Sequence, residues 1–230
     1  MSHLLAIYAD HDTPPKSDAK HVFRPESQRF CDEATAAGWV CTRAPFDNRA
    51  SLPARRKEVE ALIAKRPGPG GTGKWGAIAF FCHGFRHGLQ TGHNTLAQAK
   101  RLGGVIAAHT ESPAIIALYA CDAARDGDAD RRDDVQGQGP GGDGGFADAL
   151  RDVLSAEHRM HGHVDAHASL GHATKNPFVR RFWMDGQSAA IGGDWLIAPG
   201  SPAWRAWVRR MANKTDTLRY TFPFETKVVL

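Results

Sequence analysis

Short apolar runs alternate along this chain with longer segments in which apolar residues recur every three or four positions. The apolar runs predict β-strands, because a strand that is covered on both faces needs no polar positions. The segments with helical spacing predict amphipathic helices between the strands. Strands are expected at residues 4–9, 39–46, 75–84, 113–122 and 163–171, and helices at 25–38, 51–66, 94–109 and 146–158.

Strands that alternate with helices predict a parallel sheet, since each helix carries the chain back across one face before the next strand begins. We therefore expect an α/β fold, a three-layer α/β/α sandwich with a mostly parallel sheet. The segment 175–230 differs, with four tryptophans among short strand-like pieces and one helix. Because no linker separates it, residues 1–230 are expected to form a single domain in which 175–230 is an appended lid or edge.

Composition excludes several classes of protein. Hydrophobic residues make up 42% of the chain and charged residues 23%, and no run of about 18 apolar residues occurs, so no membrane partner is expected. The formal net charge is +4, but the basic residues are scattered and form no stripe, so nucleic acid is not an expected partner either. The apolar run near residue 4 lacks a basic leader and a cleavage site, which favours a first strand over a signal peptide.

The four cysteines, Cys31, Cys41, Cys82 and Cys121, follow no spacing typical of a zinc site or a disulfide framework. So few cysteines in a chain of this length indicate a reducing, cytoplasmic setting. In such a setting a cysteine is more often a catalytic nucleophile than half of a disulfide, and we expect these cysteines to be unpaired.

Two of the predicted strands end in residues with chemistry, at His83-Gly84 and at Cys121. Ligands of open α/β sheets bind at the carboxyl ends of the strands, and one crossover helix between the two strands predicts that they are neighbours. Neighbouring strands lie about 4.8 Å apart, so an imidazole and a thiol at matched ends can meet. The imidazole would activate the thiol as a nucleophile, and the N–H groups of Gly84 and Cys121 would form an oxyanion hole.

An apolar strand ending in His83-Gly84, followed after one helix by an apolar strand ending in Ala120-Cys121, resembles the caspase-like cysteine peptidases. This group includes caspases, metacaspases, legumain and the bacterial CHAT domains. The resemblance covers roughly the first 170 residues. It implies a caspase-hydrolase-like fold with His83 as the base and Cys121 as the nucleophile. Only Ala120-Cys121 matches the caspase signature Q-A-C-[RQG]-G, so caspase specificity is not implied.

The resemblance also implies a protein or peptide substrate and no cofactor. Carboxylates after two strands, at Asp10, Asp12 and Asp122, would favour a basic side chain in the substrate residue before the scissile bond. Many caspase-like relatives outside the caspases cut after Arg or Lys, in agreement with this preference. We expect His167, near the end of a later strand, to line the same cleft. A regulatory protein partner or a homodimer is left open.

Two other functions remain open. The residues His163, Asp165 and His167 would share one face of a strand, at a spacing that suits a metal-dependent hydrolase. No H-E-x-x-H helix or second carboxylate cluster accompanies them, so no metal is the favoured expectation. The other alternative is a catalytically silent scaffold that keeps the fold and binds a regulatory partner. Cys82 is expected in the core, because it points away from the side of the strand that carries His83.

Overall fold

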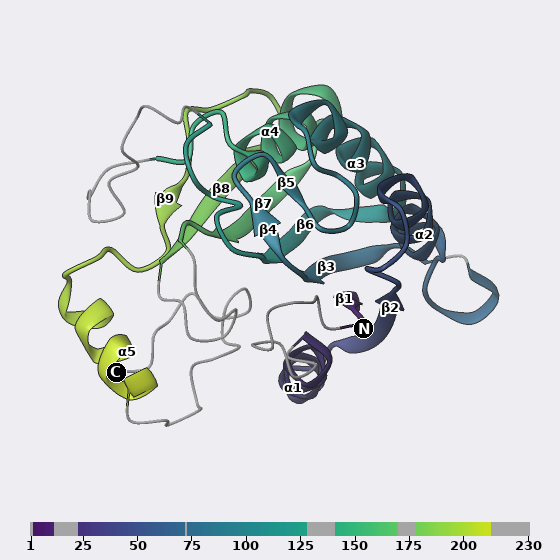
Figure 1. Cartoon of the computed structure of the whole chain (residues 1–230), viewed down its shortest axis with the longest axis horizontal. Helices are drawn as coiled ribbons and strands as arrows, with labels where there is room; N and C mark the ends of the chain where they lie inside the picture. The colour runs from purple at the N-terminus through teal and green to yellow at the C-terminus, as the bar shows by residue number, and fades with distance from the viewer. Residues whose placement is uncertain (1, 12–22, 72, 128–140, 170–177, 213–230) are drawn as a thin grey trace.

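The structure is a computed structural model that describes residues 2–11, 23–71, 73–127, 141–169 and 178–212. Within these residues a seven-stranded sheet runs in the order β2-β1-β3-β6-β7-β8-β9 (Figure 1). Its strands are β1 (His3–Ala9), β2 (Val40–Phe46), β3 (Trp75–Phe81), β6 (Thr110–Tyr119), β7 (His161–His167), β8 (Val179–Asp185) and β9 (Asp194–Trp195). The helices are α1 (Phe23–Ala36), α2 (Leu52–Ala64), α3 (Leu96–His109), α4 (Phe146–Asp152) and α5 (Pro202–Ala212).

The sheet is mixed and mostly parallel. Strands β2, β1, β3, β6 and β7 are parallel to one another, whereas β8 and β9 join antiparallel at one edge. The predicted α/β class with a mostly parallel sheet is therefore confirmed. Strands β8 and β9 come from the C-terminal segment and extend the same sheet.

Helices cover both faces of the sheet (Figure 1). One apolar cluster joins the sheet to α2, α3 and α4 through side chains that include Ile63, Ile106 and Leu150. A second cluster on the opposite face joins it to α1 through Phe30 and includes the partly buried Trp204 of α5. The predicted three-layer arrangement follows from these two clusters, because each amphipathic helix buries its apolar stripe against one face of the sheet.

The central strands β3 and β6 send alternate side chains to the two clusters. Phe80 and Leu118 face the helices α2, α3 and α4, whereas Phe81 and Tyr119 face α1. All seven residues of β3 are buried, as expected for a parallel strand with helices on both sides. This alternation determines the face on which residues just beyond each strand emerge.

The expectation that no cysteines pair is wrong, because Cys31 and Cys41 form a disulfide. Cys31 lies on α1 and Cys41 on β2, and packing of the helix beside this edge strand leaves their Cα atoms 5.4 Å apart. Their spacing in the sequence carries no disulfide signature, so only the packing of α1 reveals the pair. The cysteines therefore no longer favour a reducing, cytoplasmic setting.

In the described part of the chain, none of the helices combines the length and the apolar character that crossing a membrane would require. The longest described helices, α1 and α3, have 14 residues each. Both pack against the sheet through buried side chains such as Phe30 and Leu102.

Candidate active site

The predicted neighbouring strands are neighbours in the structure. Strands β3 and β6 pair in parallel, and their last residues, Phe81 and Tyr119, are directly opposite in the register. His83 and Cys121 each follow two residues after this pair. The two residues therefore leave the sheet at the same level of its carboxyl edge, where ligands of such sheets bind.

The ends of the two strands show from which face of the sheet the imidazole emerges. The rings of Phe81 and Tyr119 stack on the α1 face, with centroids 4.5 Å apart and planes 6° from parallel. Because strand side chains alternate, residues two positions later continue toward this face. His83 does so, since its ring meets the ring of Phe23 at the start of α1 edge-on, 5.2 Å between centroids. His83 and Cys121 are both half-buried.

Cys82 takes the opposite side, as predicted. It is 1% exposed and packs in the cluster that faces α2, α3 and α4. Burial raises the pKa of the Cys82 thiol to about 12. A thiol with such a pKa forms almost no thiolate near neutral pH, so Cys82 is no competitor for nucleophilic chemistry.

At Gly84, the loop after His83 packs closely against the backbone that follows β6. A Cβ atom on Gly84 would overlap the carbonyl oxygen of Cys121 and lie 2.7 Å from the Cβ of Ala120. Glycine is therefore required at this position by the close approach of two backbone segments. This reason differs from the expected one, in which the glycine opened the backbone to a substrate.

A small hairpin follows His83 and was not predicted from the sequence. The strands β4 (Gly84–Phe85) and β5 (Gly88–Leu89) pair antiparallel. Only Arg86 and His87 connect them, and His87 Nε2 lies 2.8 Å from the carbonyl oxygen of Gly127. The connecting Arg86-His87 is not a typical sequence for a two-residue hairpin turn, so the sequence carried no clear signal for this hairpin.

The N-terminus of α4 holds the loops that follow both candidate residues. The N–H of Phe146 donates to the carbonyl of Arg86, in the loop after His83, at 2.9 Å. The N–H of Ala147 donates to the carbonyl of Ala123, in the loop after Cys121, also at 2.9 Å. Two of the N–H groups that have no partner within a helix thus connect the two loops.

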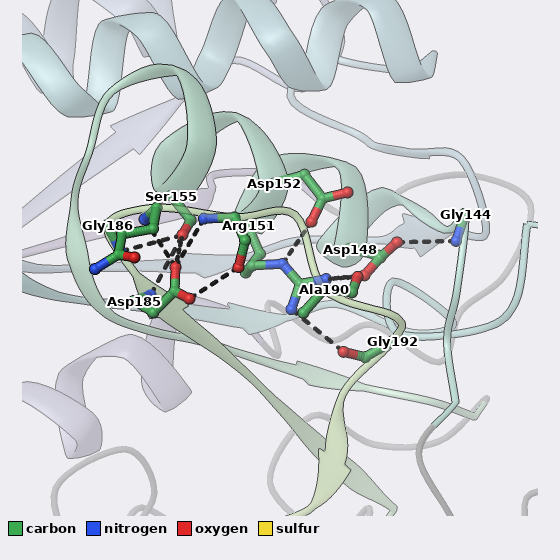
Figure 2. Close-up of polar contacts among 11 residues, drawn as sticks. Gly144, Asp148, Arg151, Asp152, Ser155, Asp185, Gly186, Ala190 and Gly192 are labelled. Atoms are coloured by element: carbon green, nitrogen blue, oxygen red, sulfur yellow. Dashed lines mark hydrogen bonds and ion pairs between the residues drawn. The ribbon is translucent and has the colours of Figure 1, made fainter.

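Helix α4 is anchored in turn by a buried guanidinium (Figure 2). Arg151 is 1% exposed and donates to the carboxylates of Asp148 and Asp152 and to the carbonyls of Ala190 and Gly192. Asp148 uses its other oxygen to accept the N–H of Gly144 at 3.0 Å, as Figure 2 shows. Burial raises the pKa of Asp148 to about 6, against the opposing effects of Gly144 and Arg151. Arg151 therefore joins α4 to the segment 190–192.

The carboxylates proposed to select a basic substrate have different surroundings. Asp122 has a left-handed backbone, with φ of 56°, and its Oδ1 lies 3.6 Å from Arg125 Nη1. Burial raises the pKa of Asp122, whereas Arg125 and Arg86 act in the opposite direction. The chain's own guanidinium groups thus compensate this carboxylate.

Asp10 lies at the carboxyl end of β1, which pairs with β3 through Tyr8 and Phe81. Two residues beyond that pair, Asp10 and His83 reach the same level of the sheet edge, and the Asp10 side chain is 33% exposed. Asp12, the other proposed substrate contact, lies outside the described residues.

His167 lies beneath the site and is fully buried at 0% exposure. Its ring meets that of Tyr119 edge-on at 5.9 Å, and its carbonyl accepts the N–H of Ala124 at 2.9 Å. A side chain with no solvent-exposed surface cannot contact a substrate in a cleft, as His167 was expected to do. We therefore assign His167 to the support of the Cys121 loop.

His163 and Asp165 lie close together, as predicted, but the main partner of the Asp165 carboxylate is Arg181. Asp165 accepts from Arg181 Nε and Nη2 at 2.8 Å each, which engages both carboxylate oxygens. His163 Nε2 lies 3.5 Å from Asp165, and burial lowers the pKa of His163. Within the described residues no group of three or more His, Cys, Asp or Glu side chains is arranged to hold a metal ion. The metal-dependent hydrolase gains no support from these contacts.

No protein-family model, no curated protein and no solved structure matches the chain. The chemistry assigned to the sheet edge therefore depends on the observed register and burial of His83 and Cys121, and on the face toward which His83 points.

Proposed function

We propose that this protein is a caspase-like cysteine endopeptidase with Cys121 as the nucleophile and His83 as the general base. One observation carries the proposal: the two residues follow neighbouring parallel strands at the same level. The last residues of these strands, Phe81 and Tyr119, are register partners, and His83 and Cys121 each come two residues later. The resemblance of the His83-Gly84 and Ala120-Cys121 motifs to caspase-like peptidases points in the same direction, as does the mostly parallel sheet with helices on both faces.

In the proposed reaction, His83 accepts the proton of the Cys121 thiol and the thiolate attacks the scissile carbonyl carbon. The resulting oxyanion accepts hydrogen bonds from the N–H groups of Gly84 and Cys121. Collapse of this intermediate breaks the C–N bond, and His83 returns its proton to the leaving amine. Water, deprotonated by His83, then attacks the thioester, releases the carboxylic acid and restores the thiol.

The proposed preference for a basic residue before the scissile bond depends chiefly on Asp10. Its half-exposed carboxylate lies at the level of His83, with His11 Nε2 3.9 Å away. Asp122 instead lies 3.6 Å from the permanently charged Arg125. A lysine or arginine side chain reaching Asp10 would form a charge-assisted contact. Replacing Asp10 with asparagine should reduce cleavage after basic residues more than cleavage after neutral ones.

Cleavage of a peptide library by the wild type and by Cys121→Ala tests the activity. A chelator should leave this activity intact, whereas it would abolish the activity of a metal-dependent hydrolase. Loss of cleavage in Cys121→Ala, with a folded protein, is the expected result. Cleavage that persists in this variant would overturn the proposal.

Alkylation of the native protein separates the peptidase from the silent scaffold without a known substrate. Iodoacetamide should label Cys121 at a rate that depends on pH and that changes in His83→Gln, while Cys82 stays unlabelled because it is buried. Slow labelling of Cys121, at the same rate in the wild type and in His83→Gln, would favour the catalytically silent scaffold.

A further inference from the structure

Gln90, which follows the β4–β5 hairpin, is hydrogen-bonded to the backbone of His83, which precedes it. After β3 ends, the chain passes through β4 and β5 and returns beside its starting point at Gln90 and Thr91. The backbone groups of these two residues act to lower the pKa of the Cys82 thiol, against the larger effect of its burial. The N–H of Gln90 also donates to the carbonyl of His83 at 2.9 Å.

The side chain of Gln90 completes this closure. Its Oε1 accepts the backbone N–H of His83 at 3.2 Å, so Gln90 contacts the N–H and the C=O of the same residue. Gln90 is 7% exposed, and its own carbonyl accepts from Nη1 of Arg55, on α2, at 3.2 Å. Gln90 therefore connects the backbone of His83 to the helical layer behind the sheet.

We propose that Gln90 is a positioning residue for His83, which fixes the direction from which the imidazole approaches Cys121. This inference rests on the proposed peptidase function. Hydrogen bonds to both backbone groups of His83 define its backbone conformation, and the Phe23 ring lies against one side of the imidazole. A base that is already oriented needs no ordering when the thiol proton moves, and small misplacements of such groups reduce rates severely.

The amide of Gln90 suits this role better than a carboxylate. A neutral acceptor satisfies the N–H of His83 without stabilising the charged imidazolium. A glutamate at the same position would keep an acceptor oxygen but add a negative charge next to the backbone of His83, and a nearby negative charge raises the pKa of a histidine. Substitutions of Gln90 can therefore separate geometry from charge.

The test compares three variants of the full chain: Gln90→Met, Gln90→Glu and the control Gln98→Met. Gln98 is a matched control because its Oε1 also accepts a backbone N–H, that of Asn94 at 2.7 Å, at the start of α3. Thermal unfolding shows that each variant is folded. The measurements are kcat and KM on a cleaved peptide, and the pH profile of Cys121 alkylation by iodoacetamide.

Gln90→Met should lower kcat by about tenfold or more with little change in KM, and should reduce the His83-dependent part of the alkylation profile. Gln90→Glu should recover much of kcat and move that part of the profile to higher pH. Gln98→Met should behave as the wild type. If Gln90→Met matches Gln98→Met in both measurements, the role of Gln90 is overturned.

The two proposals fail differently. A wild-type alkylation profile that does not change in His83→Gln would overturn the proposed function, and the role of Gln90 with it. A wild-type profile that depends on His83 but is unchanged in Gln90→Met would overturn the role of Gln90 alone.

Discussion

Gly84 lies directly against the carbonyl oxygen of Cys121, on the side where any other residue would carry its Cβ. The backbone that follows the proposed base and the backbone of the proposed nucleophile therefore touch. Such contact lets a shift of either loop move both residues together. Even a methyl side chain at Gly84 would therefore disturb both loops.

Replacing Gly84 with alanine should separate these two loops. The methyl group has to displace the backbone of Ala120 and Cys121, and we expect a loss of about 1–3 kcal/mol in the free energy of unfolding. Alkylation of Cys121 should lose its dependence on His83. Chemical denaturation and alkylation rates measure the two effects.

Gly104 is the matched control for this substitution. It lies within α3, and the nearest atom to an added methyl group would be Nε2 of His158 at 3.7 Å, an ordinary contact. Gly104→Ala should raise the free energy of unfolding by about 0.5–1 kcal/mol, because alanine favours a helix interior. A Gly84→Ala protein as stable and as reactive as the wild type would contradict the observed contact.

His93 should make the stability of the protein depend on pH. It is fully buried, with Nδ1 2.9 Å from the Thr91 hydroxyl and Nε2 3.4 Å from Glu60, and burial lowers its pKa to about 4. The unfolded chain takes up this proton near pH 6.5 and the folded chain only near pH 4. The contribution of His93 to stability is therefore complete above about pH 6.5 and falls as the pH drops toward 4, by up to about 3 kcal/mol.

The prediction for His93 is measured as the slope of unfolding free energy against pH between about 6.5 and 4. The slope should be smaller in His93→Gln, whatever the absolute stability of that variant. His158→Gln, at an exposed histidine, should keep the wild-type slope. An equal slope in the wild type and in His93→Gln would show that His93 does not titrate as predicted.

The disulfide between Cys31 and Cys41 should stabilise the fold by linking α1 to β2. It closes a loop with a sequence separation of 10 residues, for which the loss of unfolded-chain entropy predicts about 2–3 kcal/mol. Adding a reductant should lower the melting temperature of the wild type and leave that of the Cys31→Ser/Cys41→Ser protein unchanged. If reductant lowers both equally, the stabilisation has another origin.

Arg151 should be far more costly to remove than an exposed cation. Arg151→Met would leave Asp148 in a buried position without its guanidinium, and we expect a loss of about 3–5 kcal/mol. Lys100 forms an exposed ion pair with Glu157 at 3.0 Å, and Lys100→Met should cost less than about 1 kcal/mol. Urea unfolding of both variants compares them directly, and similar losses would contradict the buried role of Arg151.

Local patterns predicted most of the elements that build the sheet. The apolar runs near residues 4, 78 and 116 became β1, β3 and β6, because a strand covered on both faces is recognisable from its continuous apolar character. The pairing of β3 with β6 followed from the single helix between them. The boundaries were less accurate, since β3 ends at Phe81 and the predicted helix 146–158 changes after Asp152 into a π-helical turn, Val153–Glu157.

The contacts around the site could not be predicted in the same way. The hairpin β4–β5 has two-residue strands, which are too short to show a period. The burial of His167 depends on the packing around the end of β7, where Asp165, Ala166 and Ala168 are buried as well. Its place near the end of a strand had given the opposite expectation, that it lines the cleft.

From the sequence alone came the α/β class, the neighbouring strands and the placement of His83 and Cys121 at their ends, because all three depend on local apolar patterns and on the order of strands and helices along the chain. Only the tertiary structure decided which distant groups meet: Cys31 with Cys41, Gly84 with Cys121, and Gln90 with His83. Such contacts are set by how helices and loops pack across the sheet, and packing depends on the whole chain rather than on any local pattern.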